Sequence, residues 1–225
     1  MEIVIQQLQL FLKILKFLIP AIPATIKITL FSFAFALVLG LLIAVARLSK
    51  RRILNIPAKI YIDIVRGVPL LVQIFFIYFG LGKILNLERF VAGIFAISIC
   101  YAAYMAEVLR AGIQAIPRGQ TEAALSLGLT RFQLWRYIII PQTLRLIAPP
   151  LVNDFISCLK DSSLVSIIGL RELTRAGTEY YSQHFVDFQT WLLVGLIYLT
   201  ITLSLTRLSS YLERKYRIPG LGIHH

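Results

Sequence analysis

The sequence predicts an all-α integral membrane protein, and three observations support this fold class. Hydrophobic residues make up 58% of the 225 residues and charged residues only 15%, and the mean hydropathy is +0.78. Long apolar segments recur along the chain, and a helix needs about 20 such residues to cross a bilayer. Basic residues cluster in the short gaps between these segments. We therefore expect one transmembrane domain over residues 1–225, with five transmembrane helices within residues 24–208.

Residues 2–19 predict an amphipathic helix before the first transmembrane segment. Polar residues recur there every three or four positions and leave an apolar face opposite, as in a helix that lies in the membrane interface (Glu2, Gln6, Gln9, Lys13 and Lys16 against Val4, Leu8, Phe11, Leu15 and Leu18). No small-residue cleavage site follows a plain apolar core, so the pattern does not favour a signal peptide. Pro20 and Pro23 are expected to end this helix.

Five apolar segments predict the transmembrane helices, at residues 24–46, 60–81, 90–109, 146–169 and 188–208. We expect Pro57 in the loop before the second segment, and an outer loop over residues 171–187, where acidic and basic side chains balance. Basic clusters follow the first, third and fifth segments, and Lys and Arg are enriched on the cytoplasmic side of a membrane. The sequence therefore predicts a multi-pass protein of the cytoplasmic membrane, with its N-terminus outside and its C-terminus, near Arg217, in the cytoplasm.

The formal net charge of +12 does not indicate a nucleic-acid partner. The basic residues lie in short clusters between apolar segments and form no basic face of the kind that nucleic acid requires, so membrane topology explains the charge better. Cys100 and Cys158 both lie inside apolar segments, and the chain has no CxxC motif and no His/Cys spacing typical of metal ligands. We expect neither a disulfide nor a metal site.

Residues 115–143 form a polar interruption between the third and fourth segments, and they predict a docking loop in the cytoplasm. Helix-forming residues from Gly119 to Leu127 precede Gly128, which is suited to a left-handed helix end, and a second helix is expected to follow. Ala123 and Ala124 leave no bulk on one face, so a groove of another protein can approach the backbone, and Glu122 offers an anionic anchor. On these residues alone, an ordinary amphipathic loop helix is the better explanation of the pattern.

The spacing in this loop resembles the signature loop of ATP-binding-cassette (ABC) importer permeases. In that signature, Glu-Ala-Ala is followed after three residues by Gly and after nine more by Ile, and then, after one residue, by a position that is usually Leu and by Pro. This chain matches with Glu122, Ala123, Ala124, Gly128, Ile138 and Pro141, and has Ile140 at the Leu position. Three more stretches resemble the polar amino acid uptake subfamily, of histidine, glutamine and arginine type (66–73, RGVPLLVQ; 106–113, AEVLRAGI; 160–164, KDSSL). The chain departs from the subfamily at Val68, where Thr is frequent, and at Cys158, where an apolar residue is common.

This resemblance implies the type I ABC importer permease fold, with a coupling helix that carries Glu122, Ala123, Ala124 and Gly128. It implies four further partners: a second permease, expected to be a second copy of this chain, two copies of a cytoplasmic ABC ATPase, an extracytoplasmic amino acid-binding protein, and the amino acid itself. The permease would hydrolyse nothing and hold no cofactor, because ATP and Mg²⁺ belong to the ATPase. Transport would proceed by alternating access, as ATPase closure moves the coupling helices and rocks the attached spans.

Charged residues inside the apolar segments are the candidates for substrate binding, because a charge within a bilayer needs protein, water or a counter-ion. Asp154 lies midway along the fourth segment and can accept a guanidinium or ammonium group, with Asn153 and Ser157 as neighbouring contacts. It favours a basic amino acid as substrate, although a structural pair with a basic residue on another span is also open. Glu107 has the same two interpretations, of which a local pair with Arg110 is favoured.

Gly67, Val68 and Pro69 predict a break in the second transmembrane segment, because Pro69 removes a helix hydrogen bond. The freed backbone groups can hold the α-carboxylate or α-ammonium of an amino acid, as broken helices do in other transporters, although a simple kink is the alternative. Tyr104, with Tyr101, can line the same cavity or simply pack against neighbouring helices. Asp63 is expected to pair with Arg66, and residues 160–163 to form an outer polar cluster or a contact with the binding protein.

The sequence favours an ATP-driven importer over two other kinds of transport protein. A channel is expected to carry a filter of charged or carbonyl-rich residues around its pore, which this sequence lacks. A secondary transporter driven by an ion gradient is expected to show internal repeats and more spans. A membrane enzyme is also disfavoured, because no nucleophile, base and orienting group occur at a recognisable spacing.

Overall fold

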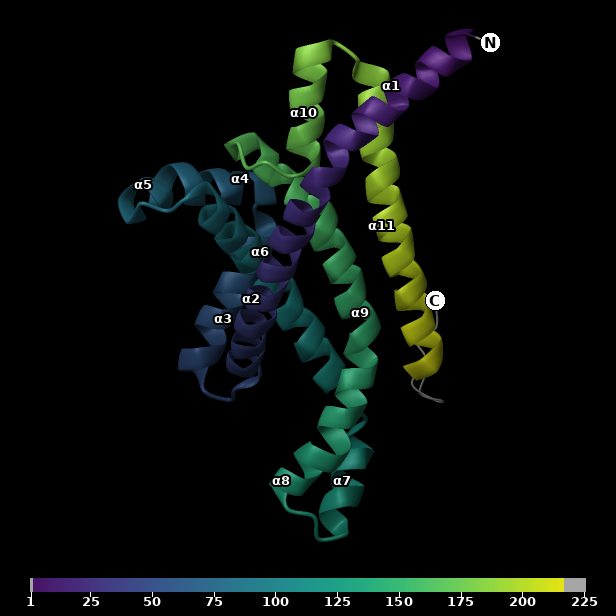
Figure 1. Ribbon diagram of the computed structural model, residues 1–225. Helices are drawn as coiled ribbons and strands as arrows, with labels where there is room; N and C mark the ends of the chain where they lie inside the picture. The colour runs from purple at the N-terminus through teal and green to yellow at the C-terminus, as the bar shows by residue number, and fades with distance from the viewer. Residues whose placement is uncertain (1, 217–225) are drawn as a thin grey trace.

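The computed structural model describes residues 2–216, and these residues form helices and connecting turns with no strand. Four long helices run side by side through the middle of the molecule: α2 (Ile22–Leu48), α6 (Arg89–Gln114), α9 (Ile140–Asp161) and α11 (Asp187–Tyr216) (Figure 1). The helices α7 (Arg118–Ser126) and α8 (Arg131–Leu134) project together at one end of this bundle. The N-terminal part of the chain and α10 (Leu173–His184) lie at the opposite end (Figure 1).

The first helix, α1 (Glu2–Leu18), continues directly into α2 through one turn of 3-10 helix at Ile19–Ala21. The prediction that Pro20 and Pro23 end a separate helix is therefore wrong. Pro20 is the second residue of the 3-10 turn, and Pro23 is the second residue of α2. At the start of a helical segment the fixed φ angle of proline suits the helix, and its missing N–H costs no hydrogen bond. Ile14 and Leu18 are fully buried against a cluster that includes Leu173, so α1 packs on α10 and α11.

Small side chains bring α2 and α6 into close contact. Every fourth residue along one face of α2 is small and buried: Ser32, Ala36, Gly40 and Ala44. At the centre of this face, a Cβ atom on Gly40 would lie 2.8 Å from Cβ of Met105 and 3.0 Å from the carbonyl oxygen of Ala102. Membrane helices associate largely through such backbone-to-backbone packing, because lipid is as apolar as the helices themselves. This contact forms the rigid centre of the bundle.

The second predicted transmembrane segment is broken, as the sequence predicts, at Gly67–Pro69. Helix α3 (Arg52–Gly67) ends there and α4 (Leu70–Phe75) begins after it. The helical segment Leu70–Leu85, which starts with α4, is bent by 106° relative to α3. A turn of π-helix (Phe76–Leu81) and the short α5 (Gly82–Leu85) complete this arm. Pro57 lies inside α3 and not in a preceding loop, because α3 already begins at Arg52.

The fourth segment begins earlier than predicted, at Ile140, and continues beyond Asp161 as a 3-10 helix over Ser162–Ile168. Gly169 ends it with a φ of +80°. The predicted outer loop is mostly helical, because α10 occupies Leu173–His184. Fully buried Glu172 caps α10 by accepting hydrogen bonds from the backbone N–H groups of Thr174 (2.9 Å) and Arg175 (2.7 Å).

Within residues 2–216, three helical stretches are long and apolar enough to cross a membrane by themselves: Val4–Leu48, Arg89–Gln114 and Asp187–Leu212. The bent pair Arg52–Gly67 and Leu70–Leu85 makes a fourth if it counts as one span. Helix α9 is long enough but carries Arg145, Asp154, Lys160 and Asp161, which place it outside that set. The protein is thus an all-helical membrane protein with several candidate spans. Arg217, in the predicted cytoplasmic C-terminal cluster, lies outside the described residues.

Candidate functional site

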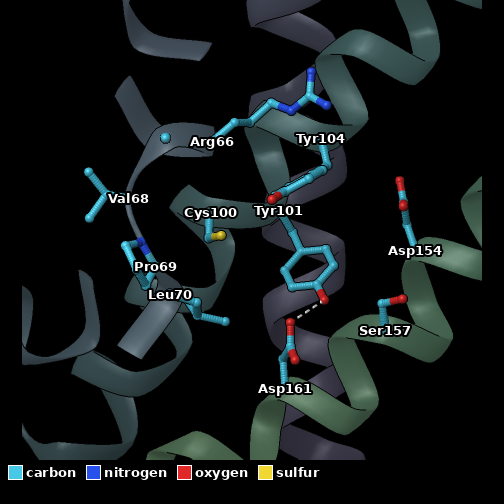
Figure 2. Close-up of a pocket in the computed structure, with 11 residues that line it drawn as sticks. Arg66, Val68, Pro69, Leu70, Cys100, Tyr101, Tyr104, Asp154, Ser157 and Asp161 are labelled. Carbon is cyan, nitrogen blue, oxygen red and sulfur yellow. Dashed lines mark hydrogen bonds between the residues drawn. The ribbon is translucent and has the colours of Figure 1, made fainter. Parts of the chain in front are cut away.

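A cavity of about 540 Å³ lies between the α3–α4 break, α6 and α9. Figure 2 shows side chains from the three parts of the chain converging on it. Its lining combines backbone of the break with polar side chains of the two long helices: Arg66, Gly67, Val68, Pro69, Leu70, Cys100, Tyr101, Tyr104, Asp154, Ser157 and Asp161. This polar cavity is the candidate binding site in the described part of the chain.

Helix α9 supplies the acidic side of the cavity. Asp154, Ser157 and Asp161 are spaced by three and four residues, so they share one face of the helix, and that face lines the cavity. Within residues 2–216, Oδ2 of Asp154 is buried and has no hydrogen-bond partner. A buried carboxylate oxygen without a partner is costly, so this atom is available to a ligand that brings a donor.

Helix α6 supplies the aromatic side of the cavity. The Tyr101 hydroxyl donates a 2.7 Å hydrogen bond to Oδ2 of Asp161, which ties α6 to α9 (Figure 2). The ring of Tyr104 lies 5.9 Å from the ring of Tyr101, one turn along the helix. Tyr104 also receives the guanidinium of Arg66, whose central carbon lies 5.1 Å from the ring centroid. The two tyrosines therefore separate the positive group of the cavity from the carboxylate of Asp161.

Arg66 occupies a different environment from the one that the sequence predicts. Within residues 2–216, no ion pair joins it to Asp63, and its head group lies over Tyr104 at the cavity instead. Arg66 ends α3 just before the break, so its side chain extends past the helix end toward α6. The cavity consequently carries a cation on the side of the break and two carboxylates on α9. This charge separation suits a zwitterionic ligand.

The structure brings five of the seven predicted substrate-binding residues to the cavity: Gly67, Val68, Tyr104, Asp154 and Ser157. Asn153 does not line it, because its side chain points toward α11 and accepts a 3.1 Å hydrogen bond from Oγ of Ser209. Glu107 does not line it either and forms the local pair with Arg110, at 2.7 Å. Asp161 does line it, although the sequence placed it in an outer polar cluster.

The predicted docking loop is a helical hairpin of α7, α8 and a π-helical turn (Trp135–Ile139). Gly128 has a φ of +79°, which confirms the predicted left-handed helix end. The N–H of Leu129 bonds to the carbonyl of Ala124 (3.1 Å) and that of Gly128 to Leu125 (3.0 Å), the Schellman pattern of a helix stop. Thr130 and Gln133 then form a capping box that starts α8.

The hairpin buries one residue that the sequence assigned to its open face. Ala124 is only 2% exposed and packs with Ile116, Leu134 and Ile139 in a small core of the loop. Its small side chain therefore permits close packing within the hairpin and not the approach of another protein. Glu122 and Ala123 are exposed. Large apolar side chains are exposed beside them, among them Leu127 (80%), Phe132 (75%) and Tyr137 (67%).

An all-helical membrane bundle with a polar cavity inside it and an exposed apolar hairpin at one end has the organisation of a membrane transport subunit. The family described as binding-protein-dependent transport system inner membrane component matches residues 36–218. The glutamine transport system permease protein GlnP of Escherichia coli (strain K12) is 40% identical over 209 residues, which cover 88% of this chain and 95% of the relative. The arginine transport system permease protein ArtQ of Bacillus subtilis (strain 168) is 33% identical over 203 residues, 89% of this chain and 93% of the relative.

Solved structures agree with these relatives. A crystal structure of an amino acid ABC transporter with histidines contains a chain that superposes with a TM-score of 0.86 at 40% identity, and the match covers 91% of this chain and 96% of that one. The MetNI methionine ABC transporter in an inward-facing conformation gives a TM-score of 0.78 at 18% identity over 92% of this chain and 99% of that one, which supports the fold alone.

The chain therefore belongs to the binding-protein-dependent transport permeases of the inner membrane, among the permeases of ABC systems for polar amino acid uptake. It is a multi-pass transport subunit and not an enzyme, and such a permease chain holds no cofactor. Membership implies two kinds of partner, an ABC ATPase and a substrate-binding protein. Because the chain is the permease subunit of an ABC-type importer, the transport is ATP-driven. The ion-gradient transporter and the channel, which the sequence alone left as alternatives, are therefore no longer open.

Proposed function

We propose that two copies of this chain form the membrane path of an ATP-driven importer that carries polar, preferentially cationic, amino acids. The observation that carries the substrate class is the unpartnered, buried Oδ2 of Asp154 in a cavity that also holds Asp161. A guanidinium or ammonium group would satisfy that oxygen with a charge-assisted hydrogen bond. The volume of about 540 Å³ falls within the usual range for small-molecule sites.

The opposite side of the cavity suits the remaining part of an amino acid. Every α-amino acid brings a carboxylate, and Arg66 beside the Gly67–Pro69 break offers positive charge there. Ser157, on the same face of α9 as Asp154 and Asp161, adds a hydroxyl to the acidic side. The relative named for glutamine transport supports a polar amino acid as substrate, and the one named for arginine transport supports the cationic preference.

The proposed topology has five spans, with the N-terminus outside and the C-terminus in the cytoplasm. Helix α9 is the fourth of these spans, with Asp154, Ser157 and Asp161 facing the cavity and Asn153 facing α11 in place of lipid. The α7–α8 hairpin, with its arginines at positions 118, 131 and 136, lies in the cytoplasm by the positive-inside rule. On this topology α10 lies on the outer side, toward the binding protein.

The exposed face of the α7–α8 hairpin is the proposed docking site for the ATPase. Glu122 supplies a negative charge there, and the exposed side chains of Leu127 and Phe132 supply apolar area. The hairpin has its own small core around Ala124, so it can move as a rigid unit. Movement of two such hairpins by the closing ATPase dimer would shift α6 and α9, between which the hairpin is inserted, and open the cavity to alternate sides.

Uptake into proteoliposomes that contain the permease, its ATPase and its binding protein tests this proposal. Labelled arginine, histidine and glutamine are compared for the wild-type protein, for Asp154→Asn, and for the control Asp63→Asn, which makes the same charge change at an exposed position outside the cavity. We expect ATP-dependent uptake in which Asp154→Asn lowers transport of arginine far more than of glutamine. Equal transport of all three substrates by Asp154→Asn and the wild type would assign selectivity to the binding protein alone.

A further inference from the structure

The break between α3 and α4 leaves carbonyl groups without a partner in their own helix, among them those of Val65 and Val68. In an α-helix the carbonyl of residue i accepts from the N–H of residue i+4. The partner of the Val65 carbonyl would be residue 69, and Pro69 has no N–H. Val68 has extended backbone angles (φ −109°, ψ 132°), so its carbonyl also leaves the helical pattern. Inside a membrane protein, such groups need another donor.

The side chain of Gln73, one turn into α4, supplies both missing donors. Its amide nitrogen Nε2 lies 2.8 Å from the carbonyl oxygen of Val65 and 2.8 Å from that of Val68. A primary amide has two N–H groups, so one side chain can donate to both carbonyls at once. The hydrogen bond to Val65 takes the place of the one that Pro69 removes. Gln73 thus joins the end of α3 to the start of α4 across the bend of 106°.

We propose that Gln73 is a positioning residue for the substrate cavity, which holds the Gly67–Pro69 backbone in its binding geometry through the Val65 and Val68 carbonyls. Gln73 does not itself line the cavity, whereas Gly67, Val68 and Pro69 all do. Its action is therefore indirect and depends on the loss of an N–H at position 69. The proposal rests on the proposed function only in taking this cavity as the amino acid site.

Because the proline creates the need for the glutamine amide, the two residues must be energetically coupled. In a Pro69→Ala background, residue 69 regains an N–H, so the backbone at Val68 can turn helical. The carbonyls of Val65 and Val68 then both rejoin the i to i+4 pattern, and Gln73 becomes less important. A double-mutant cycle of Gln73→Met and Pro69→Ala measures this coupling, since Met has similar length and no N–H. Gln9→Met on the exposed side of α1 is the matched control for the exchange itself.

The experiment uses the complete permease–ATPase complex in detergent and two measurements. Equilibrium dialysis gives the Kd of labelled arginine, and thermal unfolding gives the Tm of the complex. We expect Gln73→Met to raise the Kd about tenfold when Pro69 is present, because the cost of unsatisfied carbonyls lowers the population of the binding geometry. The same change should raise the Kd less than about twofold in the Pro69→Ala background. Gln9→Met should leave the Kd and the Tm unchanged.

Equal effects of Gln73→Met in the two backgrounds would overturn the proposal. Failure of Gln73→Met to assemble in both the wild-type and the Pro69→Ala background would also overturn the proposal, because the N–H restored at residue 69 would then not replace the Gln73 amide. Assembly only with Pro69→Ala would support the coupling. If the wild-type complex binds no arginine, the proposed function fails, and the coupling of Gln73 to Pro69 is then read from the four Tm values alone.

Discussion

The Tyr101 hydroxyl donates a 2.7 Å hydrogen bond to Asp161, and this bond fixes one of the two carboxylates in the cavity while the other, on Asp154, keeps an oxygen without a partner. The two acidic residues lie on one face of α9 but differ in their availability to a ligand. Asp161 already has a donor from α6. Asp154 is therefore the carboxylate that a cationic substrate would meet unpaired, and Asp161 serves first to join the two helices.

We expect Tyr101→Phe to destabilise the protein, because it leaves the Asp161 carboxylate in the cavity without its donor. The loss of one partner of a buried hydrogen bond costs about 1–3 kcal/mol of unfolding free energy. Chemical or thermal unfolding of the purified complex measures this change. Tyr104→Phe is the control, since within residues 2–216 no hydrogen bond to the Tyr104 hydroxyl is seen, and it should have little effect on stability. An equal loss in both variants would contradict the structural role of the Tyr101–Asp161 bond.

The contact between α2 and α6 gives a second prediction. Gly40→Ala places a Cβ atom 2.8 Å from Cβ of Met105, so the helices must separate, and we expect a loss of about 1–3 kcal/mol in stability. Gly195→Ala on α11 is the matched control, because nothing lies within 4 Å of its added Cβ. Alanine favours helix over glycine by up to about 1 kcal/mol, so this variant should be neutral or more stable. The Tm should therefore fall with Gly40→Ala and stay the same or rise with Gly195→Ala, and an unchanged Tm of Gly40→Ala would contradict the close packing.

Glu172 gives a prediction about pH, and it lies outside the proposed spans. Burial raises the pKa of Glu172 above its ordinary value, and the hydrogen bonds from the N–H groups of Thr174 and Arg175 partly offset this effect. The folded protein then holds the carboxyl proton more tightly than the unfolded chain. This contribution to stability is fully present below the ordinary glutamate pKa and is lost as the pH rises through the folded pKa.

Glu172→Gln removes that titration, so the Tm of the variant should depend less on pH above the ordinary glutamate pKa than the Tm of the wild type. The measurement is thermal unfolding of the complex at a series of pH values that begins below the ordinary glutamate pKa and rises to neutral pH. Glu88→Gln is the control at an exposed position before α6 and should retain the wild-type pH profile. Parallel profiles for Glu172→Gln and the wild type would exclude Glu172 as the source of the dependence.

Local chemistry explains which parts of the fold are predictable from the sequence. The break at Pro69 and the helix stop at Gly128 follow from a missing N–H and from a left-handed backbone, and both are found where the sequence places them. Pro20 and Pro23 at the start of their helical segments, and Pro57 inside α3, show the limit of the same rule, because none of them ends a helix. Only the packing of α1 on α10 and α11 decides that the chain continues as one helix there.

The cavity was predictable only where a single helix determines it. Asp154 and Ser157 share a helical face, and Asp161 lies on the same face one turn further, a spacing that could have identified it. Asn153 and Arg66 were not predictable in this way, because their partners are a residue of α11 and a residue of α6, far away in the sequence. The burial of Ala124 was not predictable either, because the residues that cover it come together only when the hairpin folds.

The helix stop at Gly128 gives the prediction that bears most directly on coupling to the ATPase. Its φ of +79° strains any residue with a Cβ by about 1–2 kcal/mol, and a β-branched side chain is the least tolerant. Nothing lies within 4 Å of a Cβ at this position, so Gly128→Val alters the turn between α7 and α8 without a clash in the bundle. We expect this variant to assemble and to bind arginine normally, but to lose the stimulation of ATP hydrolysis by the loaded binding protein.

Gly119→Ala is the matched control for this variant, because it lies in the same hairpin, has open space around it and is not among the glycines of positive φ. It should retain full stimulation. Glu122→Lys reverses the charge on the exposed face without strain and should also uncouple transport from hydrolysis, provided that this face binds the ATPase. Substrate-stimulated hydrolysis and uptake are measured on the same proteoliposomes. If Gly128→Val and Glu122→Lys both retain coupled uptake, the ATPase does not act through the α7–α8 hairpin, and the movement of α6 and α9 must be driven from another surface.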